Sequence, residues 1–347
     1  MDLFFELLRL SLGNSKELSI IPSTNEWNAL LIEAESQAVI GVLFSGLERL
    51  SDYQRPPKEL LLRWIGLVQR IESVGQLHRE RAKDLTSLFY LEGFDCCILK
   101  GVSISSLYPN PLRRQSGDID LLTSGRRKEV MKWLQSKYVF NEIRWHHVDA
   151  KIFKDVQTEI HFYACWLFNP YHNKRLQEWM SENGLIFSIE TEYGYKVPSV
   201  RFNAIHSLVH SFHHLIESGI GFRHVVDYYY VLKSIKEEIK SDLFDAIKSI
   251  GLNKYLGAMM YVLTVSCGAS PEMLLCAPDE REGVFLLKEI LSSGNFGNKR
   301  DCRTIHNNSF RRFWVMIKHY PNEVLWMYPW KIWHWLWRRR WLDSRKR

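Results

Sequence analysis

The sequence predicts an α+β fold in which a small mixed β-sheet core is flanked by N- and C-terminal helical regions. Apolar residues recur at helical spacing through residues 1–93, and they do so again from residue 201 onward. Between these stretches, short strand-like runs alternate with helix-like segments in the order strand, helix, strand, helix, hairpin. This order is typical of a mixed sheet with helices packed against it. We therefore expect three regions, at residues 1–93, 94–200 and 201–347.

The first region is expected to be helical throughout. Phe4, Leu7 and Leu8 mark an apolar helix face near the start. Pro56-Pro57 interrupts the pattern and opens a new helix, because proline is tolerated in a first helical turn. Residues 64–91 are then expected to form one long helix with many charges on its outer face.

The central region is predicted to hold four strands and two helices. Gly93 precedes the first strand, and the His146-His147 pair is expected in a loop near the sheet. The predicted strands are residues 94–99, 119–123, 151–154 and 157–163, and the predicted helices are residues 101–108 and 126–137.

The last region is again predicted to be helical, with helices at residues 203–217, 224–239, 255–265 and 281–291. Residues 326–341 are dense in tryptophan and arginine, and two interpretations stay open. This composition suits a membrane interface or an acidic partner. Alternatively, the tryptophans pack on the domain while the arginines remain solvated.

Composition indicates an ordinary folded protein. The 347 residues are 46% hydrophobic and 24% charged, with no low-complexity tract. The formal net charge of +7 favours anionic partners, but much of the excess lies at Arg338–Arg340 and in residues 345–347, so it does not indicate a nucleic-acid partner. Cys96 and Cys97 lie in an apolar run and are expected to be buried, reduced thiols.

The start of the chain, residues 1–8, lacks a basic segment and a cleavage site, so we expect no signal peptide. No segment has about twenty uninterrupted apolar residues, so no membrane span is expected. We therefore expect a cytoplasmic protein, with peripheral membrane contact through the C-terminal tail as the alternative.

Asp118 and Asp120 carry the main functional prediction. Residues i and i+2 of a strand point to the same face, so the two carboxylates project together while Ile119 anchors the strand. Adjacent carboxylates repel, and a divalent cation between them removes that cost. Mg²⁺, or Mn²⁺ in its place, would bind one or two carboxylates together with substrate phosphates. Glu159 on a neighbouring strand would complete a two-metal site, so the predicted catalytic and metal-binding residues are Asp118, Asp120 and Glu159.

The segment around Lys100 is predicted to bind phosphates. It lies where a strand gives way to a helix, a place where backbone N–H groups and the helix dipole favour anions. Gly101 allows close backbone approach, Ser103 can cap the helix or contact phosphate, and Lys100 supplies a point charge. Arg113 and Arg114 can hold phosphate in a bidentate manner, and we favour Arg114, although either could instead pair with a nearby carboxylate.

Together these motifs resemble the uncharacterised bacterial nucleotidyltransferase family of the polymerase-beta-like nucleotidyltransferase superfamily. The resemblance spans roughly residues 94–232. The matching strings are Leu99-Lys100-Gly101, Leu107-Tyr108-Pro109, Arg114, Gly117-Asp118-Ile119-Asp120-Leu121-Leu122, Glu159-Ile160-His161 and residues 218–227.

The resemblance implies a nucleotidyltransferase fold, with Mg²⁺ bound by Asp118, Asp120 and Glu159. It also implies a nucleoside triphosphate donor such as ATP, with Gly117 in the nucleotide-binding turn. The superfamily commonly has a Gly-Gly or Gly-Ser turn shortly before the acidic pair. Here Gly101-Val102-Ser103 is spaced out, and its distance along the chain to Asp118 is longer.

Three further candidates have two interpretations each. His161 either forms a hydrogen bond to a metal-bound carboxylate or stacks in the core. Arg223 and Asp227, four residues apart, either line the pocket or form an intrahelical ion pair. Four histidines on one predicted helix face either bind a transition metal or pack locally; they are His206, His210, His213 and His214.

The sequence thus predicts transfer of a nucleoside monophosphate from a triphosphate to a hydroxyl or phosphate acceptor. The acceptor could be a small molecule, a sugar, a peptide or a protein, and the residues do not choose among them. The alternative is a catalytically weak nucleotidyltransferase fold that acts as a binding module, attached to a membrane through its C-terminal tail. Nucleic-acid binding is the weakest hypothesis, because no recognisable reading motif accompanies the basic residues.

Overall fold

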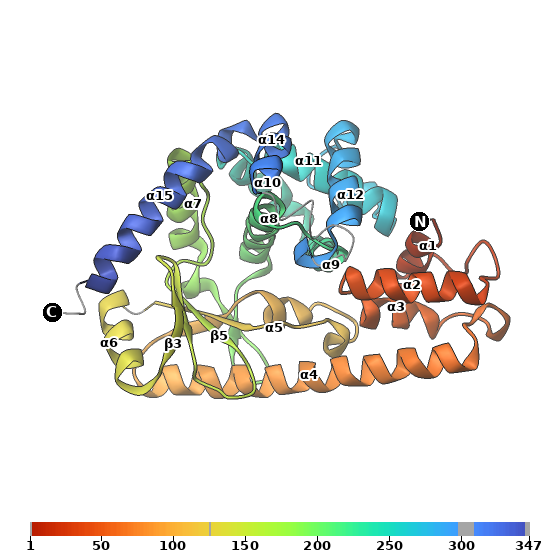
Figure 1. Ribbon diagram of the computed structural model, residues 1–347, viewed down its shortest axis with the longest axis horizontal. Helices are drawn as coiled ribbons and strands as arrows, with labels where there is room; N and C mark the ends of the chain where they lie inside the picture. Colours follow the sequence, from red (N-terminus) through yellow and green to blue (C-terminus); the bar gives the residue numbers. More distant parts are fainter. Residues whose placement is uncertain (1, 125, 298–308, 344–347) are drawn as a thin grey trace.

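One 34-residue helix, α4 (Lys58–Leu91), runs along the length of the molecule and supports both the N-terminal helices and the sheet (Figure 1). The computed structural model describes residues 2–124, 126–297 and 309–343. Trp64 of α4 meets Trp27 edge to face at 6.2 Å, whereas Leu85 and Phe89 near its end belong to the core beneath the sheet. α4 begins directly after Pro57, as predicted from Pro56-Pro57, and continues without a break through the stretch expected at residues 64–91. The helices beside its first half are α1 (Asp2–Leu12), α2 (Thr24–Ser36) and α3 (Ile40–Leu47).

A five-stranded mixed sheet with the order β1-β2-β5-β4-β3 forms the centre of the fold. β2 pairs parallel with β5, whereas the other neighbouring strands are antiparallel. Two helices accompany the sheet, α5 (Lys100–Ser105) after β1 and α6 (Arg127–Lys137) after β2. The predicted α+β fold with a small mixed sheet is confirmed. The strands are β1 (Cys96–Ile98), β2 (Ile119–Thr123), β3 (Phe140–Ile143), β4 (His147–Ala150) and β5 (Thr158–His161).

Two expectations for the sheet are wrong. The strand predicted at residues 151–154 lies earlier, as β4 (His147–Ala150), so His147 is part of a strand and not of a loop. Val148 and Ala150 are buried while Asp149 is partly exposed, the alternation of a strand with one covered face. β3 (Phe140–Ile143) was not predicted, because only Ile143 of its residues is buried. The next segment, also without a prediction, holds α7 (Pro170–Asn183) and the hairpin of β6 (Ile189–Glu190) and β7 (Lys196–Val197).

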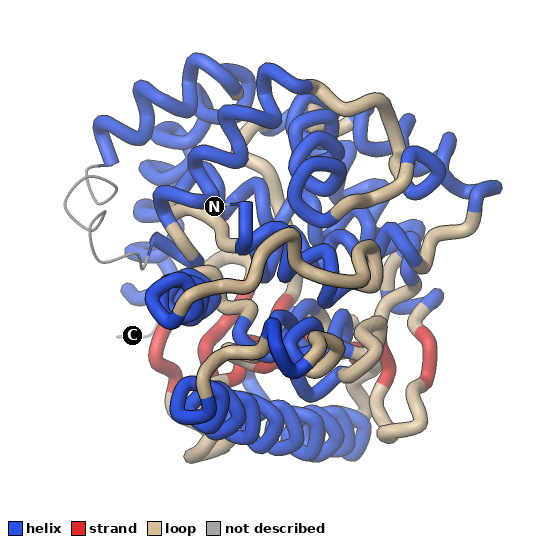
Figure 2. Tube along the Cα trace, turned by 90° about the vertical axis from the view of Figure 1, so that its right-hand side faces the viewer, coloured by secondary structure: helices blue, strands red, loops and turns tan. Residues whose placement is uncertain are grey.

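Helices from the second half of the chain cover the other side of the sheet from α4, and Figure 2 shows the strands between the long basal helix and the remaining helices. α8 (Val200–Glu217) is buried along most of its length and is the central helix of this layer. α9 (Phe222–Lys233) ends six residues before the expected boundary, where a short 3-10 turn follows. The others are α10 (Lys240–Ser249), α11 (Asn253–Val262), α12 (Glu280–Ser293), α14 (Ser309–His319) and α15 (Pro321–Asp343).

The tryptophan-rich segment forms α15, which extends toward α6 at one end of the molecule (Figure 1). Trp330 stacks on Trp166 at 3.8 Å with an interplanar angle of 11°. Arg338 lies 3.5 Å from Glu142. Other residues of the helix face outward, and Ile332 is 61% exposed. Packing on the domain is thus observed for Trp330, whereas contact of the outer face with a membrane or an acidic partner stays a prediction. Residues 345–347 of the basic tail lie outside the described residues.

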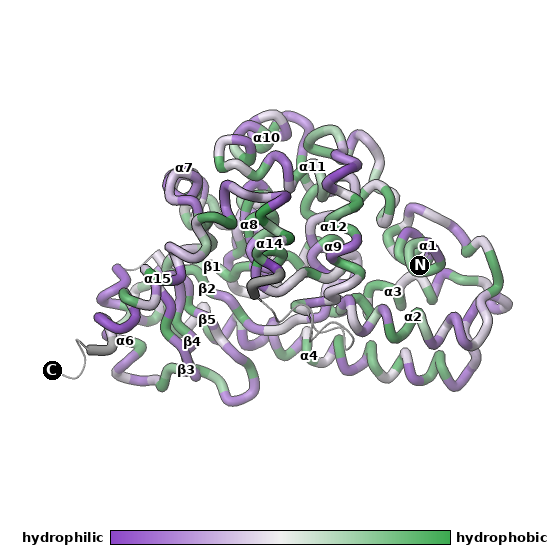
Figure 3. Tube along the Cα trace, turned by 45° about the horizontal axis from the view of Figure 1, so that its top comes forward, coloured by the Kyte–Doolittle hydropathy of each residue, from purple (hydrophilic) through white to green (hydrophobic). Residues whose placement is uncertain are grey.

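Burial follows the sequence expectations elsewhere. Cys96 and Cys97 are buried free thiols, as predicted. Hydrophilic and hydrophobic residues alternate along the whole of α4 (Figure 3), consistent with a helix that has one solvated face. Within the described ranges, no helix is both long enough and apolar enough to cross a membrane.

Candidate active site

Three carboxylates gather on one face of the sheet. Asp120 of β2 and Glu159 of β5 are direct partners in the parallel register, and Asp118 lies two residues before Asp120. An oxygen from each of the three carboxylates lies within 4.8 Å of the other two. The structure thus brings together the three residues predicted to bind metal.

Lys100 and His161 surround the inner carboxylate of this group. Lys100 Nζ lies 2.7 Å from Asp120 Oδ1, and His161 Nε2 lies 2.8 Å from the same oxygen. Burial disfavours the charged form of Asp120, but these two neighbours outweigh it and hold the pKa of Asp120 well below its ordinary range. Asp120 is therefore expected to stay ionised at neutral pH.

The pKa of Asp118 is shifted in the opposite direction from that of Asp120. The negative charge of Asp120, followed by partial burial, raises the pKa of Asp118 to about 6, and Lys100 compensates only in part. The pair thus shows the repulsion that a bound cation would relieve. Burial also opposes the charge of Glu159, yet His161 and Lys100 lower the pKa of Glu159 below its ordinary value. Three ionisable oxygen donors this close together fit a hard divalent cation.

A row of polar side chains extends the site beyond the predicted residues. In β4, His147 pairs with His161 and Asp149 pairs with Glu159 across the sheet. His161 Nε2 also lies 3.1 Å from Glu159 Oε2, and His147 Nε2 lies 3.1 Å from Asp149 Oδ1. His161 therefore contacts both carboxylates directly, and its ring also packs against His147 with centroids 5.0 Å apart, so features of both interpretations are present.

Arg114 and Asp227 form a buried ion pair beside the carboxylates. Arg114 donates from Nε and Nη2 to the two oxygens of Asp227, both at 2.7 Å, and the Tyr108 hydroxyl donates to Asp227 at 2.6 Å. The intrahelical pair of Asp227 with Arg223 is therefore not formed. Gly101 makes room for this arrangement, because a Cβ there would lie 3.1 Å from Arg114 Nη1.

Two of the predicted phosphate-binding residues, Arg113 and Ser103, do not line the cavity. Arg113 pairs with Glu48 and Glu72, away from the site. Ser103 is 1% exposed, and its hydroxyl lies 3.5 Å from Nδ2 of Asn203 in α8, so it faces α8 and is not part of the cavity lining.

Gly117, just before the acidic pair, does line the cavity, and its carbonyl oxygen lies 3.0 Å from His78 Nε2 of α4. Lys100 has a positive φ of 45°, a strained conformation for a residue with a side chain.

The three carboxylates, together with Lys100, His161 and the Arg114–Asp227 pair, line a cavity of about 400 Å³ between the sheet and the α8–α9 helices. Its cationic lining residues are Lys100, Arg114, Arg144 and Arg223. Arg223 donates to the Gln115 carbonyl at 3.2 Å, and its Nε is buried without a hydrogen-bond partner. Burial, followed by the charge of Arg114, lowers the pKa of Arg223 to about 10, so an anion bound in the cavity would stabilise the charged form of Arg223.

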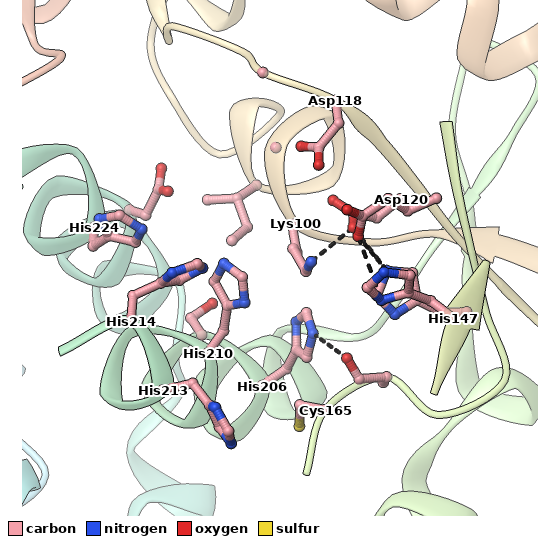
Figure 4. A pocket seen from close by; sticks show the side chains of 18 of the residues that line it. Lys100, Asp118, Asp120, His147, Cys165, His206, His210, His213, His214 and His224 are labelled. Atoms are coloured by element: carbon pink, nitrogen blue, oxygen red, sulfur yellow. Dashed lines mark hydrogen bonds and ion pairs between the residues drawn. The ribbon is translucent and has the colours of Figure 1, made fainter. Parts of the chain in front are cut away.

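Histidines of α8 and α9 form the opposite wall (Figure 4); they are His206, His210, His213, His214 and His224. Three further histidines line the cavity on the sheet side, His146, His147 and His161. Sequence reasoning identified the α8 histidines as a group but did not place them opposite the acidic pair. It also missed Asp149, although the polar–apolar alternation of residues 147–150 was a visible signal.

A family model described as uncharacterised nucleotidyltransferase matches residues 23–265, which include every residue of the carboxylate group and of the α8 histidine wall. A search of curated proteins finds no match. Among solved structures, the chain is similar to an antigenic nucleotidyltransferase-like protein from Paracoccidioides brasiliensis. The identity is 12%, the TM-score is 0.33, and the alignment covers 56% of this chain and 93% of that chain.

Proposed function

The chain belongs to the family of uncharacterised nucleotidyltransferases, and from this premise we propose that it is a metal-dependent enzyme. It would transfer a nucleoside monophosphate from a nucleoside triphosphate to a hydroxyl or phosphate acceptor. Placement of the family in the polymerase-beta-like superfamily is part of the same proposal. The observation that carries it is the approach of Asp118, Asp120 and Glu159 oxygens within 4.8 Å at the wall of one cavity.

Asp118, Asp120 and Glu159 would hold Mg²⁺ or Mn²⁺. When bound, such an ion lowers the pKa of an attacking hydroxyl and neutralises phosphate charge. The lowered pKa of Glu159 makes it a better metal ligand than a general base, because a base works best with a pKa near the operating pH. His161 holds the carboxylates of Asp120 and Glu159 in place through its two contacts.

Cationic residues would bind the triphosphate. Lys100 lies 17% exposed at the cavity wall, where its ammonium can contact phosphate as well as Asp120. Arg223 has a buried Nε without a hydrogen-bond partner, which leaves it free to donate to a phosphate. Arg114 already binds Asp227 through two of its nitrogens, so its main role is to fix the position of α9 against the nucleotide-binding segment.

The test is a thermal-shift series on the full chain with each nucleoside triphosphate, with and without Mg²⁺. A ligand at 100 times its Kd adds about 2.7 kcal/mol. For 347 residues the unfolding entropy is about 0.7 kcal/mol per kelvin, so the midpoint should rise by about 4 °C. Asp118→Asn/Asp120→Asn should lose the Mg²⁺-dependent shift, whereas the exposed control Asp242→Asn should keep it.

Pyrophosphate release in the presence of small-molecule, sugar and peptide acceptors would then identify the second substrate. A folded wild-type chain that shows no shift with any triphosphate would contradict the proposal.

A second candidate function is favoured by the outer face of α15. Ile332, Trp335 and Leu336 are 61%, 53% and 46% exposed, and Arg339 and Arg340 are exposed beside them. Apolar and aromatic side chains next to arginines suit an anionic membrane surface. In this case the protein would act as a catalytically weak, membrane-peripheral binding module. Cosedimentation with anionic vesicles, lost in Ile332→Asp/Trp335→Asp and absent with neutral vesicles, would support it.

A further inference from the structure

A second group of metal-ligand side chains lies in the same cavity, away from the carboxylates. His210 and His214 are four residues apart on α8, and His224 lies in the first turn of α9. One ring nitrogen from each lies within 4.8 Å of the other two. Figure 4 shows the three rings together on the helical side, with Lys100 between them and Asp120.

The three imidazoles are in the chemical state that metal ligands require. Burial, before any neighbouring charge, lowers the pKa of His210, His214 and His224 well below the ordinary value, so all three are neutral. His224 is 7% exposed, and its Nδ1 is buried without a hydrogen-bond partner. A buried nitrogen without a partner costs about 1–3 kcal/mol, and a metal ion bound at Nδ1 of His224 would recover that cost.

We propose that His210, His214 and His224 form a second, separate binding site for a zinc-type transition-metal ion, with its fourth position open to the cavity. Imidazole nitrogens favour Zn²⁺ and related ions over Mg²⁺, whereas carboxylates favour Mg²⁺, so the two groups would select different metals. A tetrahedral ion with Zn–N bonds of about 2.0–2.1 Å sets its ligand nitrogens about 3.3 Å apart. Small side-chain rotations of the three rings would bring them to this spacing.

The charge around the cluster predicts the fourth ligand. Three neutral imidazoles leave the full charge of the ion uncompensated, and Arg223, whose guanidinium lies 5.0 Å from the Phe296 ring, adds a further positive charge. Phe296 itself contacts His214 and His224, with ring centroids 4.6 and 5.3 Å away. An anion, either hydroxide or a phosphate oxygen, is therefore the expected fourth ligand. The inference does not depend on the proposed nucleotidyl transfer.

Co²⁺ is the probe for this site, because tetrahedral coordination by nitrogen ligands gives strong visible absorption. The metal-stripped full chain is titrated with Co²⁺ in excess Mg²⁺, and Zn²⁺ is then added in competition. We expect one tetrahedral Co²⁺ per chain, displaced by Zn²⁺. His210→Gln and His214→Gln should each weaken Co²⁺ binding by more than about 100-fold, since even a residue that only supports a ligand contributes about 10–100-fold.

Two controls separate this site from its neighbours. His213→Gln changes the adjacent α8 histidine, whose ring packs on Trp166 at 3.9 Å, and should leave Co²⁺ binding unchanged. Glu159→Gln disrupts the other histidine-containing group, His147-Glu159-His161, and should also leave it unchanged. Circular dichroism of each metal-free variant checks that it is folded. Absence of tetrahedral Co²⁺ from the wild type, or its loss in Glu159→Gln and retention in His210→Gln, would overturn the proposal.

Discussion

Removing the charge of Asp118 is expected to stabilise the metal-free protein. Its pKa is raised from 3.8 to about 6, chiefly by the charge of Asp120, so the folded state binds the proton more tightly than the unfolded state. Below pH 3.8 the group is protonated in both states and has no effect. The folded state loses stability as the pH rises from there to about 6, and the loss is constant at higher pH.

The difference between the two pKa values corresponds to about 3 kcal/mol. Because Asp118 is partly exposed, solvent screening reduces the expected gain in Asp118→Asn to about 1–2 kcal/mol. The unfolding entropy of a chain this long is about 0.7 kcal/mol per kelvin, so Tm should rise by about 2 °C.

The assay is thermal unfolding of wild type and Asp118→Asn in a metal chelator at pH 4, 5 and 8. We expect the variant to be more stable at pH 8 and the difference to shrink toward pH 4. Asp120→Asn is the matched control with the opposite sign, because it leaves Lys100 without its partner at 2.7 Å and should cost about 3 kcal/mol. A lower Tm for Asp118→Asn at pH 8, or a difference that does not change with pH, would refute the reasoning.

Three other perturbations test the remaining parts of the structure. Asp227→Asn leaves Arg114 buried without its counter-charge and should cost about 3–5 kcal/mol, a fall in Tm of about 4–7 °C in thermal unfolding; an unchanged Tm would argue against a buried pair. Lys100→Met should weaken triphosphate binding at least tenfold in calorimetric titration and should also lower Tm without nucleotide, because Asp120 loses its partner; unaltered affinity would remove Lys100 from the site. Trp330→Ala removes the stack on Trp166 and should cost about 2–3 kcal/mol in denaturant unfolding, whereas the exposed control Trp335→Ala should stay within about 0.5 kcal/mol.

The acidic pair and its strand could be predicted from sequence because their pattern is local. Asp118 and Asp120 flank one apolar residue of a strand, so their common face follows from strand geometry alone. The pairing of Asp120 with Glu159 also needs the parallel register of β2 and β5, which the sequence only suggests. The helices of the first and last regions were predictable from their apolar spacing, whereas α7 was not predicted. α9 ends at Lys233, six residues before the expected boundary.

The histidine wall and the Arg114 contact could not be predicted, because both depend on how α8 and α9 are placed over the sheet. His224 joins His210 and His214 only through the packing of two helices, and no sequence spacing encodes that distance. Asp227 likewise forms its ion pair with Arg114, which is 113 residues away in the sequence, and not with Arg223 of the same helix. Ser103 was misplaced because α5 turns its hydroxyl toward the interior.

Helix α4 packs on two parts of the molecule, so it limits where the chain can be divided. Its first half packs on the N-terminal helices through Trp64, whereas its second half supplies Leu85 and Phe89 to the core beneath the sheet. His78, between these two halves, lies 3.0 Å from the Gly117 carbonyl, next to the acidic pair. A fragment that begins at residue 94, the expected boundary, would lack α4 and therefore Leu85 and Phe89 of its own core. The three regions are therefore not interchangeable modules, and recombination with relatives should join chains outside α4 instead of at its end.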